Sequence, residues 1–81
     1  GIEAETRQVL ANLEAVLRES GMYKGNVVKT TVFMKDLKEF GTMNAAYQLF
    51  FHDHKPARST VEVSNLPRGA RIEIEAVAAK D

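Results

Sequence analysis

The apolar residues of this 81-residue chain alternate between helical and strand-like spacing, and that alternation limits the folds open to it. Over residues 2–20 and again over residues 36–51, apolar side chains recur every three or four positions and would line one face of a helix. Residues 26–35, 57–64 and 70–79 are shorter and carry the β-branched or alternating apolar side chains of strands. We therefore predict an α+β domain in the order α-β-α-β-β, with both helices packed on one face of a small mixed sheet.

Local signals set the limits of the helices and the place of the first strand. Gly21 follows the first helix, where glycine takes a left-handed conformation without a steric penalty. Asp36 and Glu39 have the three-residue spacing of a capping box at the start of the second helix. Residues 26–35 carry apolar side chains on both faces, so we expect this strand inside the sheet, parallel to the strand that follows the second helix.

The last two strands are joined by residues 65–69, where Pro67 and Gly69 indicate a turn, and we predict a hairpin. If the valines of one strand and the isoleucines of the other both face the core, the polar residues of the two strands share the opposite face. That face would hold Arg58, Thr60, Glu62, Arg71, Glu73 and Glu75. A loop of residues 65–68 would set Arg58 opposite Glu75 and diagonal to Glu73.

This charged face has two interpretations. The first is an anion clamp, because a fixed guanidinium binds a carboxylate through two hydrogen bonds and a nearby glutamate can take a proton from water. The second is a solvent-exposed ladder of alternating charge, which is common on antiparallel sheets. The residue pattern by itself favours the ladder.

Asn44 is a polar residue on the apolar stripe of the second helix. An unpaired buried amide would cost roughly 1–3 kcal/mol, so a buried Asn44 needs a hydrogen-bond partner in the sheet or in a turn. A helix rotated so that Asn44 meets water is the alternative.

The composition narrows the classes of function. Eleven basic residues balance eleven acidic residues, so no strong overall field attracts nucleic acid or an anionic membrane. No apolar run approaches the roughly 20 residues that span a bilayer. The sequence has no cysteine, which excludes thiolate chemistry and suits a reducing compartment such as the cytoplasm. His52, Asp53 and His54 lack a further ligand at a set spacing, so we expect a solvated loop and no metal site.

Four stretches of the chain resemble the Rid family of reactive intermediate deaminases, also called YjgF. They are residues 6–21, 26–51, 56–70 and 72–78. The most specific signature is "PARS" at 56–59, followed by "IEIEA" at 72–76. The resemblance implies a single Rid domain over residues 1–81 with the chorismate-mutase-like Rid fold.

The resemblance also implies an activity. Rid enzymes hydrolyse 2-imino acids and their enamine tautomers, such as 2-iminobutanoate and 2-iminopropanoate, to 2-keto acids and ammonia without a metal or cofactor. By motif, Arg58 would hold the substrate carboxylate and Glu73 would position and activate the attacking water. Asn44 and Thr60 would lie at the substrate, Thr60 standing where many relatives carry cysteine. The partners implied are a small 2-imino acid and two further copies of the chain, in a homotrimer with sites at the subunit interfaces.

The chain departs from the family pattern at its beginning. Relatives usually start with a loop that bears a Pro-Tyr-Ser-type motif and then with strands, and residues 1–81 resemble the part that follows. We therefore expect a Rid domain without the N-terminal strands. The alternative function is a non-catalytic carboxylate-binding or assembly module, or a fragment without activity. Some Rid proteins are described as ribonucleases, but zero net charge and the lack of a histidine placed for phosphodiester chemistry argue against that here.

Overall fold

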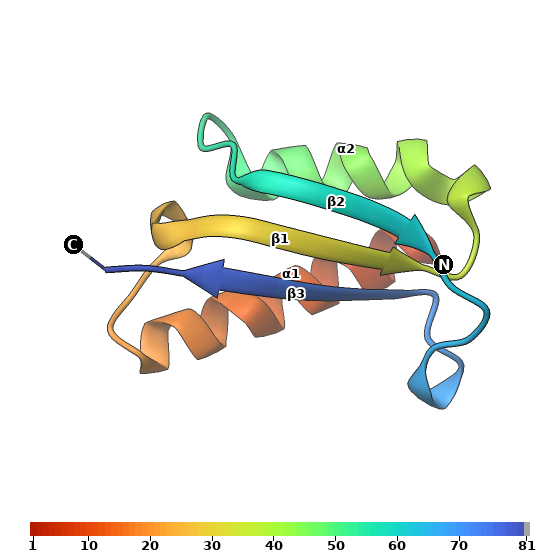
Figure 1. Cartoon of the computed structure of the whole chain (residues 1–81), viewed down its shortest axis with the longest axis horizontal. Helices are drawn as coiled ribbons and strands as arrows, with labels where there is room; N and C mark the ends of the chain where they lie inside the picture. Colours follow the sequence, from red (N-terminus) through yellow and green to blue (C-terminus); the bar gives the residue numbers. More distant parts are fainter. Residues whose placement is uncertain (81) are drawn as a thin grey trace.

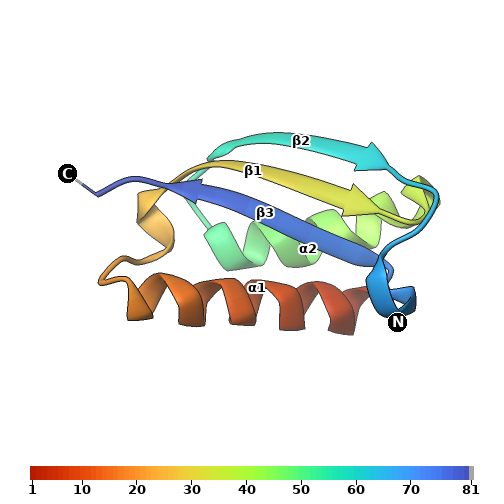
Figure 2. The same ribbon diagram turned by 60° about the horizontal axis from the view of Figure 1, so that its bottom comes forward.

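The computed structural model, which describes residues 1–80, has two α-helices and three strands in the predicted order (Figure 1). The helices are α1 (Ile2–Glu19) and α2 (Phe40–Phe51), and the strands are β1 (Val27–Met34), β2 (Ala57–Glu62) and β3 (Ile72–Ala78). Both helices lie on the same side of the sheet (Figure 2). The predicted α+β architecture is confirmed.

The sheet has the order β2-β1-β3, with β1 in the centre, parallel to β2 and antiparallel to β3. The inner position of β1 and its parallel pairing are confirmed, but the predicted hairpin is wrong, because β2 and β3 lie on opposite sides of β1. Residues 63–71 cross the end of β1, where the N–H of Val63 bonds to the carbonyl of Met34 and the N–H of Lys35 to the carbonyl of Arg71. A period-two pattern fixes which residues share a face of the sheet; it does not fix which strand is the neighbour.

The register also corrects the predicted polar face. Arg58 is paired with Thr30, and Thr30 is buried on the helix side of the sheet. Glu73 is paired with Phe33, three residues further along β1 and therefore on the outer side. Arg58 and Glu73 thus lie on opposite faces, and the same alternation separates Thr60 and Glu62 from Glu75.

The position of Arg58 on the helix side, and of Val61 on the outer side, has a physical cause at the edge of the sheet. β2 is an edge strand, and its valine, Val61, is 40% exposed on the outer face. On the helix side, α2 offers Arg58 a hydrogen-bond acceptor and aromatic rings, so a charged side chain is accommodated there without a bare desolvation cost.

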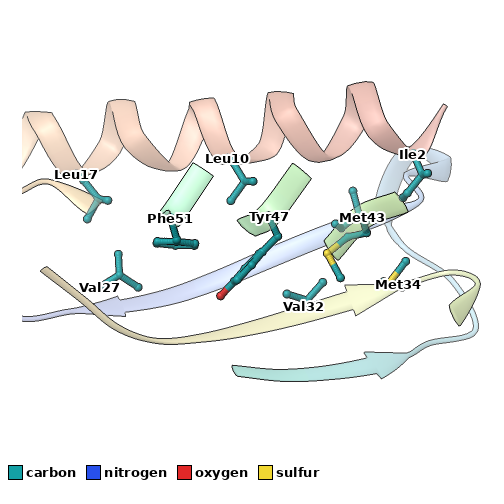
Figure 3. Packing of buried hydrophobic residues seen from close by; sticks show 10 residues of the cluster. Ile2, Leu10, Leu17, Val27, Val32, Met34, Met43, Tyr47 and Phe51 are labelled. Carbon is teal, nitrogen blue, oxygen red and sulfur yellow. The ribbon is translucent and has the colours of Figure 1, made fainter. Parts of the chain in front are cut away.

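The core lies between the helices and β1 (Figure 3). α1 and α2 contribute three large residues each, β1 contributes three more and β3 contributes one. They are Ile2, Leu10, Leu17, Met43, Tyr47, Phe51, Val27, Val32, Met34 and Ile72. The outer face of the sheet has no such cover in residues 1–80: Val28 is 51% exposed and Val77 is 58% exposed.

The helix ends follow the sequence signals in part. Gly21 takes the predicted left-handed conformation, with φ of 73°. The second helix begins later than predicted, at Phe40, because Leu37–Glu39 forms a 3₁₀ turn. Asp36 caps that turn by accepting a hydrogen bond from the N–H of Lys38, whereas the carboxylate of Glu39 binds Arg71, so the capping box is only half formed.

The helices and the histidine-containing loop bear on two sequence expectations, which concern a membrane span and a metal site. None of the helices in residues 1–80 is long and apolar enough to cross a membrane. In the same residues, no group of three histidine, aspartate or glutamate side chains could hold a metal ion. His54 of the predicted loop instead donates from Nε2 to the carbonyl oxygen of Val27, at 2.6 Å.

Candidate active site

Arg58 is held in place by α2. Pro56, which has no N–H to donate, precedes β2, and Arg58 is the second residue of the strand. Its Nη1 donates a hydrogen bond of 2.6 Å to Oδ1 of Asn44. Its guanidinium carbon lies 4.7 Å from the ring centroid of Tyr47 and 5.3 Å from that of Phe40. Cations at such distances are attracted to the ring face, so three residues of one helix fix a half-buried guanidinium.

The prediction that Asn44 reaches a hydrogen-bond partner in the sheet is confirmed, and the partner is Arg58. Asn44 is half-buried rather than fully enclosed. Its amide oxygen accepts a hydrogen bond from Nη1, one of the three nitrogens of the guanidinium. No hydrogen bond from Nε or Nη2 and no ion pair of Arg58 occurs within residues 1–80, so these two donors remain for a ligand.

Tyr47 has a second role that its place in the apolar stripe of the helix concealed. Its ring is in the core, and its hydroxyl is directed at β1 (Figure 3), where it lies 2.7 Å from Oγ1 of the buried Thr30. The general signal was available in the sequence, because a buried tyrosine hydroxyl usually finds a partner. The identity of the partner depends on the packing of α2 against β1.

Thr60 is two residues beyond Arg58 on the same face of β2. Its hydroxyl oxygen is buried and has no hydrogen-bond partner among residues 1–80. An unpaired buried hydroxyl costs about 1–3 kcal/mol. Thr60 therefore places an unsatisfied buried hydroxyl on the same face of β2 as the guanidinium of Arg58.

A cavity of about 370 Å³ lies at the end of α2, and Arg58 is part of its wall. The rings of Tyr47 and Phe51 line it on the helix side. His52, His54 and Lys55 line it from the loop before β2, and no carboxylate is among its lining residues. This lining favours a small anion with an apolar body.

Glu73 stands apart from these residues. It is exposed on the outer face of β3, with β1 between it and β2. The chain therefore brings together Arg58, Asn44 and Thr60, adds Tyr47 and Phe40 to them, and leaves Glu73 on the other side of the sheet.

Comparisons with known proteins place this arrangement in a family. The family model described as Endoribonuclease L-PSP, which represents the YjgF/Rid family, matches residues 1–80. The chain belongs to the YjgF/Rid family. The predicted membership and the Rid fold are confirmed.

Individual YjgF/Rid relatives are similar over almost the whole chain. The 2-iminobutanoate/2-iminopropanoate deaminase of Escherichia coli is 49% identical over 98% of this chain. The crystal structure of the YjgF gene product of E. coli matches with a TM-score of 0.96 and 48% identity, over 100% of this chain and 66% of that one. The structure of E. coli TdcF with bound serine matches with a TM-score of 0.96 and 37% identity, over 100% and 66%. The chain spans 64% of the length of the E. coli deaminase and 58% of the length of the mouse deaminase.

Proposed function

We propose that this Rid protein hydrolyses small 2-imino acids, such as 2-iminobutanoate and 2-iminopropanoate, to 2-keto acids and ammonia. The observation that carries the proposal is the half-buried guanidinium of Arg58, fixed by Asn44 and two aromatic rings. Fixed guanidinium groups bind carboxylates through two parallel hydrogen bonds, and Nε with Nη2 form a suitable pair of donors. Relatives named for this activity, and one described with bound serine, support a substrate of amino-acid size.

The chemistry needs few groups beyond this anchor. An imine carbon is electrophilic, so a water molecule adds to the C=N bond and gives a carbon that bears both a hydroxyl and an amino group. Transfer of a proton to the nitrogen lets ammonia leave as the C–N bond breaks and the C=O bond forms. Glu73 positions the water and accepts its proton, while Thr60 and Asn44 contact the substrate beside Arg58. The proposed reaction uses no metal or cofactor.

Glu73 serves Arg58 from a second copy of the chain. The two residues lie on opposite faces of one sheet, so a substrate bound at Arg58 is out of reach of Glu73 in the same copy. The uncovered outer face carries Glu73 together with the exposed side chains of Val28, Val61 and Val77. Apolar patches of this kind favour association, and we propose a homotrimer with a site at each interface.

The activity is tested with imines made in the reaction mixture, because they are unstable in water. A threonine dehydratase supplies 2-iminobutanoate and an amino-acid oxidase supplies 2-iminopropanoate. We expect added protein to accelerate ammonia release above the spontaneous rate, in proportion to its concentration. A rate equal to the spontaneous rate, for a folded protein and both imines, would refute the proposed reaction.

The second candidate is a module that binds carboxylates without turnover. The separation of Glu73 from Arg58 within one chain favours it, since each copy carries the anchor on one face of its sheet and the proposed base on the other. Light scattering distinguishes the two at the outset. A particle with three times the 9.0 kDa mass of the chain would support an enzyme whose site is shared between subunits. A monomer would support the binding module. A cytoplasmic setting agrees with the cysteine-free sequence.

A further inference from the structure

A row of contacting side chains that begins at Thr30 links two strands and one helix. The Oγ1 of Thr30 on β1 lies 2.7 Å from the hydroxyl oxygen of Tyr47 on α2. The ring of Tyr47 then carries the guanidinium of Arg58 on β2, 4.7 Å from its centroid. Thr30 is 1% exposed and Tyr47 is 6% exposed, so water does not compete for the bond between them.

The hydrogen bond at the hydroxyl of Tyr47 affects how the guanidinium of Arg58 lies over the ring. A phenol ring in a core can tilt about its side-chain torsions, and the hydroxyl is the atom farthest from those axes, so a bond there limits the tilt. The attraction between a cation and a ring depends on the cation lying over the ring face. A ring with a fixed tilt therefore fixes the plane of the guanidinium.

The hydrogen bond from Arg58 to Asn44 does not by itself fix the plane of the guanidinium. It holds one nitrogen, Nη1, and leaves the guanidinium free to turn about that contact. Together with the ring of Tyr47 it determines both the position and the plane of the group. The N–H groups of the remaining donors, Nε and Nη2, are then held in a single orientation. Arg58 and Tyr47 line the same cavity, and Asn44 is not among its lining residues.

We propose that Thr30 and Tyr47 are positioning residues that orient Arg58 for a substrate carboxylate. Tyr47 acts through the face of its ring, and Thr30 acts through the hydroxyl of Tyr47 without touching the substrate. The inference rests on the proposed function, in which Arg58 is the carboxylate anchor. It assigns a task to two residues that otherwise look like ordinary members of the core.

Two substitutions each remove the hydrogen bond between Thr30 and Tyr47. Tyr47→Phe removes the hydroxyl and keeps the ring, and Thr30→Val removes the partner and keeps the shape. We expect each to raise the dissociation constant for the product 2-oxobutanoate about 5- to 20-fold, and to raise KM for 2-iminobutanoate more than it lowers kcat. The double variant should resemble either single variant, because residues of one contact are not additive.

The matched control is Thr6→Val. Thr6 is also fully buried, and its hydroxyl donates a 2.7 Å hydrogen bond to the carbonyl of Ile2, but it lies on α1 away from Arg58. Thr6→Val should lower the denaturant midpoint as the other variants do, and it should leave the affinity for 2-oxobutanoate unchanged. Loss of affinity in Thr6→Val equal to that in Thr30→Val would show a general effect of stability and would overturn the proposal.

NMR of the arginine side chain gives a readout that needs no turnover. Rotation of the Arg58 guanidinium about its Nε–Cζ bond should be slow in the parent chain and in Thr6→Val, and several-fold faster in Tyr47→Phe and Thr30→Val. Equal rotation rates in all four proteins would overturn the positioning role. If the parent chain binds no 2-oxobutanoate and hydrolyses no imine, the proposed function fails, while these rotation rates still decide whether Thr30 and Tyr47 orient Arg58.

Discussion

Arg58 and Asn44 form a hydrogen bond of 2.6 Å between β2 and α2, and this bond takes one of the guanidinium nitrogens out of competition for a ligand. The partner of Arg58 in the chain is thus a neutral amide rather than a carboxylate. A carboxylate partner would satisfy the charge of the arginine, whereas an amide holds the group and leaves its charge for a bound anion. This choice of partner agrees with the proposed role of Arg58 as a carboxylate anchor and differs from a structural ion pair.

Arg58 itself gives the first prediction. Arg58→Ala should lower kcat/KM for 2-iminobutanoate by on the order of 10³-fold, because both binding and orientation of the carboxylate are lost. Arg58→Lys should not restore the rate, since an ammonium group lacks the planar pair of donors. Steady-state rates with an imine generated in the cuvette measure both variants. A parent-like rate in Arg58→Ala would reduce Arg58 to a charge at the edge of the sheet.

Replacing the amide of Asn44 with a carboxylate gives the second prediction. Asn44→Asp should keep the chain folded and bind Arg58 more strongly, and for that reason it should weaken the binding of 2-oxobutanoate about 10-fold or more. Isothermal titration measures the affinity. Thr42→Asp adds the same charge to an exposed position of α2 and serves as the control. Equal affinities of the parent and Asn44→Asp would contradict the view that the neutral partner keeps Arg58 available.

The unpaired hydroxyl of Thr60 gives a prediction about stability. Thr60→Val keeps the shape and removes a buried polar group that has no partner in residues 1–80, so the free energy of unfolding should rise by up to about 1 kcal/mol. Thr6→Val removes a hydroxyl that has a partner and should lower the same free energy by about 1 kcal/mol. Urea titrations of the two variants compare them directly. A loss of stability in Thr60→Val as large as that in Thr6→Val would mean that Thr60 is satisfied in the folded protein.

Glu73 gives a prediction that separates turnover from binding. Glu73→Gln keeps the shape and removes the base, so kcat should fall by about 10²-fold or more while the affinity for 2-oxobutanoate changes little. Glu75→Gln is the matched control, since Glu75 lies on the same outer face of β3 two residues away and is also exposed. Similar losses of kcat in the two variants would point to the charge of the face rather than to a specific base.

The sequence predicted the elements of this fold well, because each element has its own local signal. The three- and four-residue spacing of α1 and the glycine at position 21 locate a helix and its end without reference to the rest of the chain. The apolar residues on both faces of β1 correctly predicted an inner strand. These properties depend on neighbours in the sequence, and neighbours in the sequence are what a pattern reports.

The pairing of strands could not be predicted in the same way. β2 and β3 have alternating patterns that suit a hairpin as well as two separate pairings with β1, and the choice between them depends on the whole sheet. The contact of Arg58 with Asn44, and that of Tyr47 with Thr30, both link α2 to a strand and exist only after the helix has packed. The family resemblance implied site roles for Arg58, Asn44, Thr60 and Glu73, but it carried no information on which face of the sheet each one occupies.

The proposed division of the site between two copies is tested most directly by mixing inactive variants. Arg58→Ala and Glu73→Gln are each expected to be nearly inactive, and they are unfolded, combined in equal amounts and refolded together. If Arg58 of one subunit works with Glu73 of its neighbour, about a quarter of all the sites after random mixing contain both intact residues. We expect a corresponding return of 2-iminobutanoate hydrolysis, absent when either variant is refolded alone. A mixture as inactive as its two components would contradict a site shared between subunits.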